Sequence, residues 1–392
     1  AGVGHINRPV KGGIVGIKDG VDDKLKSALV IDRDEKAPAI SLADSSEILD
    51  INLEKSKAKR ILCDCDAVIP ANENIETLIS IDEIAREIDI DLLFDINAYN
   101  ISSSKILSNK LMDELKVPIP KPWPECGFPV IVKPSGQSGS IGVRKAYSTE
   151  DVSSAVNTIH GMGDKEVIQE FADGPNISIE VIGDGTRAKS MILTEVVLDD
   201  KYDCKMVRCP MQNIDPDTLD SFSRYGESIA KALKLKGIMD VEAIYSKKGL
   251  KILEIDARIP SQTPAAILNA TGVNLIKHLV EAVKGNLSGP QPADGSAIYE
   301  HLIFENGILR SCGEKVFAGV ENPRIEYGLF GSSEMITDYE PGKDRWHATM
   351  ITKGKMPEDT WDKRQKCIEC ILKENNIKQY LDPAPEVITL PA

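Results

Sequence analysis

The sequence predicts an α/β (α+β) protein that opens with a doubly wound βαβ domain and closes with an α+β region. In the N-terminal third, short β-branched runs alternate with helical stretches, which is typical of parallel βαβ units. The 392 residues suffice for about two to three domains. Hydrophobic residues make up 42% and charged residues 28%, so we expect a sizeable core and little disorder.

The first domain is expected over residues 1–100. Three short apolar runs, at 28–31, 67–70 and 92–94, are predicted to be strands. Between the second and third runs, residues 75–88 have the apolar spacing of a helix. A nucleotide-binding fold normally opens with a strand, a glycine-rich turn and a helix. Residues 12–16 are a poor version of that turn, and no GxGxxG motif follows. We therefore predict no dinucleotide-binding turn here.

A second unit is expected over residues 101–173, opening with a helix that Ser102–Ser104 cap and that runs to Leu115. Four prolines between 118 and 124 then mark a linker. The elements expected next are a strand at 129–133, a Gly/Ser loop at 134–142, a helix at 149–160, and a strand at 167–171 paired with one at 177–182.

The remaining chain divides into units 174–290 and 291–392. The first should contain a helix at 217–234, a hairpin made of strands 237–244 and 250–256, and a mostly helical stretch at 267–284. From residue 296 the pattern becomes short strands and turns, and an amphipathic helix follows near 358–374.

Charge and composition exclude several classes of function. The chain carries 47 Lys and Arg against 61 Asp and Glu, a formal net charge of −14, and only 5% aromatic residues. We therefore expect neither nucleic acid nor an anionic membrane surface as a partner. No apolar run approaches the roughly 20 residues that cross a bilayer. Eight dispersed cysteines without paired zinc-ligand spacing favour reduced thiols and a cytoplasmic location.

The predicted hairpin carries a cluster of carboxylates. Asp240 lies on its first strand, and Glu254 and Asp256 lie two residues apart on its second. Residues two apart project from the same face of a strand, and cross-strand neighbours are close enough to share a ligand. Such acids repel one another unless a cation intervenes, and Mg²⁺ suits carboxylates together with phosphates. The alternative is a solvated polar face balanced by Arg258 and nearby lysines.

The predicted loop after Lys133 offers a place for phosphate. Its serines and glycines can present backbone amides to an anion, and Lys133 adds a point charge at the strand end. The loop is not a Walker A motif, and an ordinary hairpin connection is the alternative. Serine catalysis has little support: Ser102-Ser-Ser-Lys105 matches SxxK, but the S-D-N and K-T-G partners are absent.

Taken in order, these features resemble the ATP-grasp ligases over roughly residues 60–285. The resemblance implies that Lys105 and Lys133 contact the phosphates of ATP and that Asp240, Glu254 and Asp256 bind Mg²⁺. It also implies that the Gly/Ser loop, with Ser135, Gly136, Ser138, Gly139 and Ser140, covers the nucleotide. The hinge segment Gln169, Glu170, Phe171 and Ala172 would hold the adenine. Two departures are Asp256, where the family usually has Asn, and Asn176, where a ribose-binding Glu is common.

Within that family, residues 28–315 are similar to the ligases of pyrrolysine biosynthesis. The most specific run is Ile255-Asp-Ala-Arg-Ile-Pro-Ser-Gln-Thr-Pro264. The resemblance implies that the carboxylate of (3R)-3-methyl-D-ornithine is joined to the ε-amine of L-lysine through an acyl-phosphate. Lys205 or Arg208 would help to hold phosphates, and Arg258 would stabilise developing charge. The candidates for substrate binding are Glu73, Ser178, Glu180 and Ser261.

Two alternatives stay open. A D-alanine ligase or another dipeptide ligase shares every catalytic feature and differs only in the substrate pocket. A nucleotide-binding regulatory protein would keep the fold without turnover. Family ligases are often dimers, so a homodimer is a further expectation by analogy.

Overall fold

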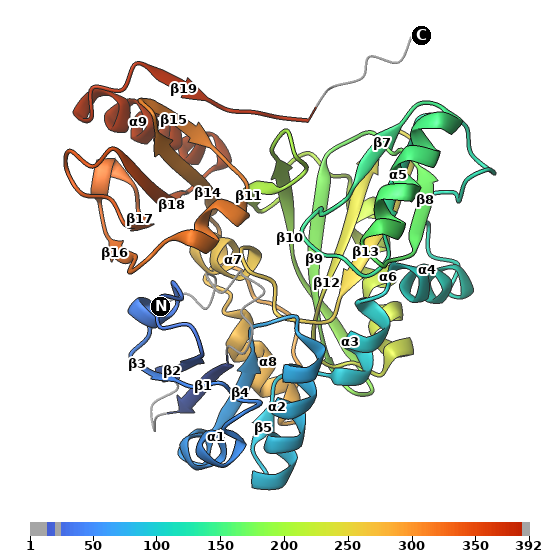
Figure 1. Cartoon of the computed structure of the whole chain (residues 1–392), viewed down its shortest axis with the longest axis horizontal. Helices are drawn as coiled ribbons and strands as arrows, with labels where there is room; N and C mark the ends of the chain where they lie inside the picture. Colours follow the sequence, from blue (N-terminus) through green and yellow to red (C-terminus); the bar gives the residue numbers. More distant parts are fainter. Residues whose placement is uncertain (1–13, 20–24, 386–392) are drawn as a thin grey trace.

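The computed structural model describes residues 14–19 and 25–385. Figure 1 shows a large sheet in the middle of the molecule, with the N-terminal domain below it. A small sheet lies at the upper right and the C-terminal region at the upper left. Of residues 12–16, whose sequence is a poor version of a nucleotide-binding turn, 12 and 13 lie outside the described residues and 14–16 belong to a strand. Across the described ranges, no helix is long and apolar enough to cross a membrane.

The N-terminal domain is a five-stranded sheet in the order β3-β2-β1-β4-β5. Its strands are β1 (Ile14–Asp19), β2 (Leu25–Asp32), β3 (Ser45–Ile48), β4 (Ala67–Pro70) and β5 (Asp91–Leu92). Its helices are α1 (Lys55–Leu62), α2 (Ile75–Ile88) and α3 (Ile96–Ser102). The expected helix at 75–88 is confirmed, and Asn74 caps it by accepting from the Thr77 amide.

The expectation of parallel βαβ units is met by only part of this domain. β2–β3 and β4–β5 pair in parallel, but β1 is antiparallel to both β2 and β4. The segment between β1 and β2 is too short for a crossover, because parallel neighbours need a connection of about a dozen residues or more.

The small sheet has the order β7-β6-β8. Its strands are β6 (Val130–Pro134), β7 (Arg144–Ala146) and β8 (Glu166–Glu170), α5 (Thr149–Gly161) packs on it, and α4 (Lys105–Glu114) precedes it. Strand 167–171 does not pair with strand 177–182 as predicted, because β8 pairs with β6. The chain leaves the small sheet at Gly174, whose φ is 151° and whose backbone lies against the Tyr245 carbonyl. That turn carries the next strand into the large sheet.

The large sheet has 11 strands, in the order β13-β12-β9-β10-β11-β14-β18-β17-β16, with β15 and β19 paired beside β14. Its first strands are β9 (Asn176–Asp184), β10 (Ala188–Leu198), β11 (Cys204–Cys209), β12 (Lys236–Ser246) and β13 (Gly249–Asp256). The later ones are β14 (Ser296–Glu305), β15 (Ile308–Ser311), β16 (Arg324–Glu326), β17 (Glu334–Thr337), β18 (Arg345–Gly354) and β19 (Gln379–Leu381). The strands at 296–305 and 345–354 are longer than expected and continue the same sheet.

Helices cover both faces of the large sheet. α6 (Pro216–Leu233) packs on Ile177, Ile179 and Val181 of β9. The opposite face carries Ile182, packed with α7 (Thr263–Thr271) and α8 (Leu275–Val283). The predicted helix at 267–284 is thus two helices, separated at Gly272, whose φ of 74° ends α7 in the left-handed region.

The C-terminal region is completed by α9 (Pro357–Glu374), which packs on β14 and β18, and by the short 3-10 helices η2 (Glu314–Gly319) and η3 (Leu329–Gly331). A further 3-10 helix of the N-terminal domain, η1 (Ile40–Leu42), lies between β2 and β3 and contacts β16. Residue 290, a predicted domain boundary, lies between strands of one continuous sheet.

Candidate active site

Acidic side chains form two rows across β9, β12 and β13. In the first row Asp240 lies opposite Glu180 on one side and Asp256 on the other. In the second row Glu242 lies between Ser178 and Glu254. Directly opposed residues in antiparallel strands project to the same face. We call these five carboxylates and Ser178 the acid ladder. The predicted hairpin therefore brings Asp240, Glu254 and Asp256 onto one surface, as the sequence argument required.

The enclosing cleft shifts the protonation of the acid ladder. Loss of water around the carboxyl raises the pKa of Glu180 to about 7 and that of Asp256 to about 6. The same desolvation, followed by the charge of Glu180, raises the pKa of Asp240 to about 8. Glu242 opens onto the cavity, yet desolvation and the charge of Asp240 raise its pKa to about 8. Full ionisation of the ladder at neutral pH is therefore unfavourable, and a bound cation would favour it.

Each predicted metal ligand has a partner of its own in this structure. Asp240 accepts a hydrogen bond from the Ser178 hydroxyl, Asp256 lies 2.9 Å from Nε of Arg258, and Glu254 lies 2.9 Å from Nζ of Lys105. No three acidic, histidine or cysteine side chains among the described residues are gathered closely enough to hold a metal ion. The donor chemistry nevertheless fits a hard cation such as Mg²⁺, because every candidate ligand is a carboxylate oxygen.

Two buried lysines face the acid ladder from the small-sheet side. Lys105 opens α4, and its Nζ also donates to the Gln137 carbonyl at 2.7 Å. Lys133 is the next-to-last residue of β6, and its Nζ lies 3.4 Å from the carbonyl of Leu253, the residue before Glu254. Burial lowers the pKa of Lys133, which makes an anionic partner favourable at this position. The two lysines that the sequence predicts as phosphate contacts therefore lie beside the carboxylates of the ladder.

The Gly/Ser loop is folded over this site. Ser138 Oγ donates to the Glu73 carboxylate at 2.5 Å, and Ser140 Oγ donates to the Tyr202 carbonyl at 2.6 Å. Ser135 and Gly136 lie at the base of the loop, where Ser135 contacts Ser104 and the Gly136 amide donates to Asp164. The tip of the loop thus contacts both the N-terminal domain and the large sheet.

A cavity of about 500 Å³ connects these groups. The predicted site residues that line it are Lys105, Lys133, Ser138, Gly139, Ser140, Gln169, Glu170, Phe171, Ala172, Ser178, Asp240, Glu254, Asp256, Arg258 and Ser261. The predicted residues outside its lining are Glu73, Ser135, Gly136, Glu180, Lys205 and Arg208. Glu180 is the fully buried member of the ladder, and Glu73 reaches the site through an ion pair of 2.7 Å with Arg258.

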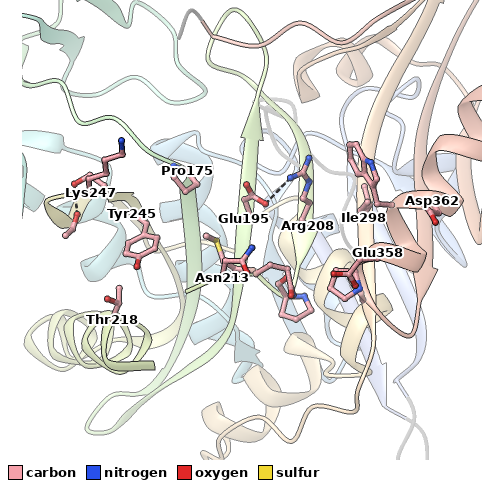
Figure 2. A pocket seen from close by; sticks show the side chains of 18 residues that line it. Pro175, Glu195, Arg208, Asn213, Thr218, Tyr245, Lys247, Ile298, Glu358 and Asp362 are labelled. Carbon is pink, nitrogen blue, oxygen red and sulfur yellow. Dashed lines mark hydrogen bonds and ion pairs between the residues drawn. The ribbon is translucent and has the colours of Figure 1, made fainter. Parts of the chain in front are cut away.

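Lys205 and Arg208 lie apart from the acid ladder. Lys205 Nζ contacts Asp382 at 2.5 Å and the Pro383 carbonyl. Arg208 lies 3.3 Å from Glu195 and stacks over Trp361 in a separate groove of about 1050 Å³. Figure 2 shows this pair between the Thr218 and Tyr245 side of that groove and the Glu358 and Asp362 side. Neither side chain is placed to meet the phosphates in this structure.

Sequence reasoning did not select Asp203, Gln262 and Glu314, which also line the cavity. One Glu314 oxygen accepts from Ser261 Oγ at 2.8 Å and from Gln262 Nε2 at 2.7 Å. Burial, followed by the charge of Glu314, raises the pKa of Asp203 to about 6. Gln262 lies in the most specific motif, residues 255–264, so the sequence could have identified it as a site residue. Glu314 belongs to no recognisable motif, so the sequence offers no signal for it.

Comparisons with known proteins agree with this geometry. An ATP-grasp domain model matches residues 102–262, which include the lysines, the hinge and the ladder. The 3-methyl-D-ornithine–L-lysine ligase of Methanosarcina mazei is 38% identical over 331 residues, covering 82% of this chain and 85% of that protein. The Methanosarcina barkeri ligase is 34% identical over 349 residues, covering 88% and 91%.

This chain belongs to the 3-methyl-D-ornithine–L-lysine ligase family. As an ATP-grasp ligase it is an enzyme, and solved structures share its fold at lower identity. A biotin carboxylase domain from Hydrogenobacter thermophilus has a TM-score of 0.66 at 17% identity, covering 86% of this chain and 82% of that one. The N5-carboxyaminoimidazole ribonucleotide synthetase of Thermotoga maritima has a TM-score of 0.58 at 16% identity, covering 87% and 91%. These two likenesses support the ATP-grasp fold of this ligase.

Proposed function

We propose that this ligase joins the carboxylate of (3R)-3-methyl-D-ornithine to the ε-amine of L-lysine in pyrrolysine biosynthesis, with conversion of ATP to ADP and phosphate. The observation that carries the proposal is the acid ladder facing Lys105 and Lys133 in one cavity, in a chain of this family. The cavity supplies carboxylates for a cation, ammonium groups for phosphates, and further acids for amine-bearing substrates.

The first half-reaction makes an acyl-phosphate. A carboxylate oxygen of the ornithine attacks the γ-phosphorus, and the bond between that phosphorus and ADP breaks. Lys105 and Lys133 hold the phosphate oxygens, and Asp240, Glu254 and Asp256 would hold Mg²⁺, which neutralises charge on the phosphates when it is bound. The hinge Gln169–Ala172 provides backbone groups for the adenine, and the tip of the Gly/Ser loop shields the acyl-phosphate from water.

The second half-reaction forms the amide. The deprotonated ε-amine of lysine attacks the carbonyl carbon, phosphate leaves, and the amine loses a proton. Arg258 forms ion pairs with Glu73 and Asp256, and its guanidinium is proposed to stabilise the oxyanion. Ser178, Glu180, Ser261 and Glu73 are proposed to contribute to substrate binding, Glu180 and Glu73 acting through neighbouring side chains. No protein nucleophile is needed, since positioning and electrostatics carry the reaction.

The test is a product assay by mass spectrometry with ATP, Mg²⁺ and pairs of amino acids. An isopeptide from lysine and the ornithine, with ADP in equal amount, is expected. An amide made only from other amino acids would point to the dipeptide-ligase alternative. Nucleotide binding without ADP formation for any pair would point to the regulatory alternative.

We also propose that the enzyme works in the cytoplasm as a homodimer. The nucleotide and the free amino acids are small cytoplasmic metabolites, and the biotin carboxylase neighbour is described as a dimer. Sedimentation equilibrium at several protein concentrations tests the dimer, and a single monomeric species throughout would reject it.

A further inference from the structure

Lys205 is a buried cation whose partner comes from the end of the described chain. Its side chain is 4% exposed, and Nζ lies 2.5 Å from Oδ1 of Asp382. The second Asp382 oxygen lies 3.7 Å from Arg364, which is 2% exposed. Asp382 thus lies between two buried cations. A buried ammonium group without a partner is strongly unfavourable, so this contact fixes the position of the chain at Asp382.

The residues that follow Asp382 reach the active-site cavity. Ala384 and Pro385 line it, together with Ser261, Gln262 and Glu314. We call residues 382–385 the C-terminal strap. Figure 1 shows the chain after β19 running across the top of the view toward the upper ends of β10 and β11. The strap reads Asp-Pro-Ala-Pro, and each proline fixes its own φ, which stiffens a short segment.

The strap lies on the side of the cavity where β11 and the loop after β13 meet. Cys204, the neighbour of Lys205, contacts the Gln262 side chain at 2.8 Å. Gln262 and Ser261 both donate to Glu314, and the same loop follows Asp256 of the ladder and carries Arg258. The hinge segment Gln169–Ala172 instead begins in β8 of the small sheet and continues directly after it. The wall near the strap is therefore the one available to the amino acids, once ATP occupies the hinge.

We propose that Asp382, held by Lys205, positions Ala384 and Pro385 as the wall that closes the amino-acid end of the cavity. Asp382 is then a positioning residue for the amino-acid substrates, and Lys205 anchors the strap. The inference rests on the proposed ligase function and gives Lys205 a role other than phosphate binding.

The test compares KM values in the full-length enzyme. Asp382→Asn should raise KM for the amino-acid substrates about tenfold, with KM for ATP changed less than about twofold. Asp382→Glu, which keeps the charge, should recover most of the loss. Ala384→Leu leaves the Lys205–Asp382 contact intact and places a larger side chain in the wall of the cavity. It should therefore also raise KM for the amino acids without changing KM for ATP. Equal changes in KM for ATP and for amino acids would overturn the proposal.

Asp338→Asn is the matched control for loss of stability. Asp338 is a largely buried acid of the same C-terminal region, paired with Lys343 and His347, and it does not line the cavity. It should lower the melting temperature and leave every KM unchanged. If its amino-acid KM rises as much as that of Asp382→Asn, the effect belongs to general destabilisation and the proposal fails.

Hydrogen exchange separates failure of this inference from failure of the proposed function. If the wild-type enzyme makes no isopeptide, the proposed function fails. The anchoring of the strap by Asp382 is then tested separately, by amide hydrogen exchange at residues 379–385. Faster exchange there in Asp382→Asn than in wild type supports the anchor. Equal exchange in the two proteins overturns it.

Discussion

Asp240 and its two cross-strand neighbours are three directly opposed carboxyl groups, and their proximity changes how they ionise. Glu180, Asp240 and Asp256 stand opposite one another, and the cleft keeps water from them. Coulomb repulsion between close carboxylates is strong where water is scarce. The Ser178 hydrogen bond and the charge of Arg258 relieve only part of this, since the pKa of Asp240 still rises to about 8. A bound cation would therefore reduce the remaining repulsion among these carboxylates.

Removing a ladder carboxylate should stop the reaction. Glu254→Ala or Asp256→Ala should reduce substrate-dependent ADP release by about a hundredfold or more, because charge on the transferring phosphoryl group is no longer neutralised. Glu83→Ala, at an exposed acid of α2 paired with Lys55, serves as control and should retain full activity. Unchanged ADP release in both ladder variants would refute the assignment of the metal site.

The acid ladder also predicts how stability depends on pH. A carboxyl whose folded pKa lies above its unfolded value loses stabilising free energy as the pH rises between the two values. For Glu180 and Asp240 that window runs from the ordinary carboxyl range to about 7 and about 8. Without Mg²⁺ the protein should therefore melt at a lower temperature at about pH 8 than at about pH 6.

Added Mg²⁺ should raise the melting temperature more at the higher pH, because the cation then meets ionised ladder groups. Differential scanning calorimetry at the two pH values measures both effects. A Mg²⁺ effect that is equal at the two pH values would contradict the prediction.

At the scale of elements, Gly174 connects the small sheet to the large one. A Cβ built there would lie 2.3 Å from the Tyr245 carbonyl oxygen, and its φ of 151° is one that other residues rarely adopt. Gly174→Ala should therefore destabilise the protein by about 1–3 kcal/mol and disturb the hinge beside it. Gly285→Ala is the control, since its φ is 87° but nothing lies within 4 Å of the added carbon.

Thermal melting together with KM for ATP measures both variants. Gly285→Ala should lose stability only, whereas Gly174→Ala should also raise KM for ATP. Equal KM values for the two variants would show that the turn at Gly174 has no bearing on the hinge.

The elements that sequence reasoning predicted well are those set by local rules. The hairpin of β12 and β13 follows from alternation on either side of a four-residue turn, and the acids at 240, 254 and 256 followed with it. The rest depends on contacts between distant segments. The β6–β8 pairing, the position of Glu180 opposite Asp240, and the Lys205–Asp382 contact across 177 residues have no local signature. Glu314 joins the site only because η2 folds back on the loop after β13.

For the whole molecule, one buried ion pair joins the C-terminal helix to the large sheet. Arg364 of α9 is 2% exposed and contacts the fully buried Glu300 of β14 through two nitrogens, at 2.8 and 2.5 Å. Arg364→Met should destabilise the protein by about 3–5 kcal/mol, because Glu300 is left buried without its partner. Arg364→Met with Glu300→Leu should lose much less, since the double variant leaves no unpaired charge. Urea unfolding measures both, and an equal loss in the two would contradict the ion-pair argument.

The net negative charge of the whole chain is partly a property of the active site. Part of the net charge of −14 is concentrated in the acid ladder. ATP is therefore expected to enter with its counter-cation, meeting Lys105 and Lys133 on the way to the carboxylates.

The continuity of the large sheet limits how relatives of this enzyme can be recombined. A chimera joined near residue 290 would pair β11 of one parent with β14 of the other, along Met206 to Cys209. Where the side chains of the two parents do not fit together, this pairing weakens and exposes strand edges, and such edges promote aggregation. Substrate preference should therefore be transplanted by exchanging loops, such as 199–203 and 257–262, inside an intact sheet. Shuffling of whole C-terminal units between related ligases is expected to yield insoluble protein.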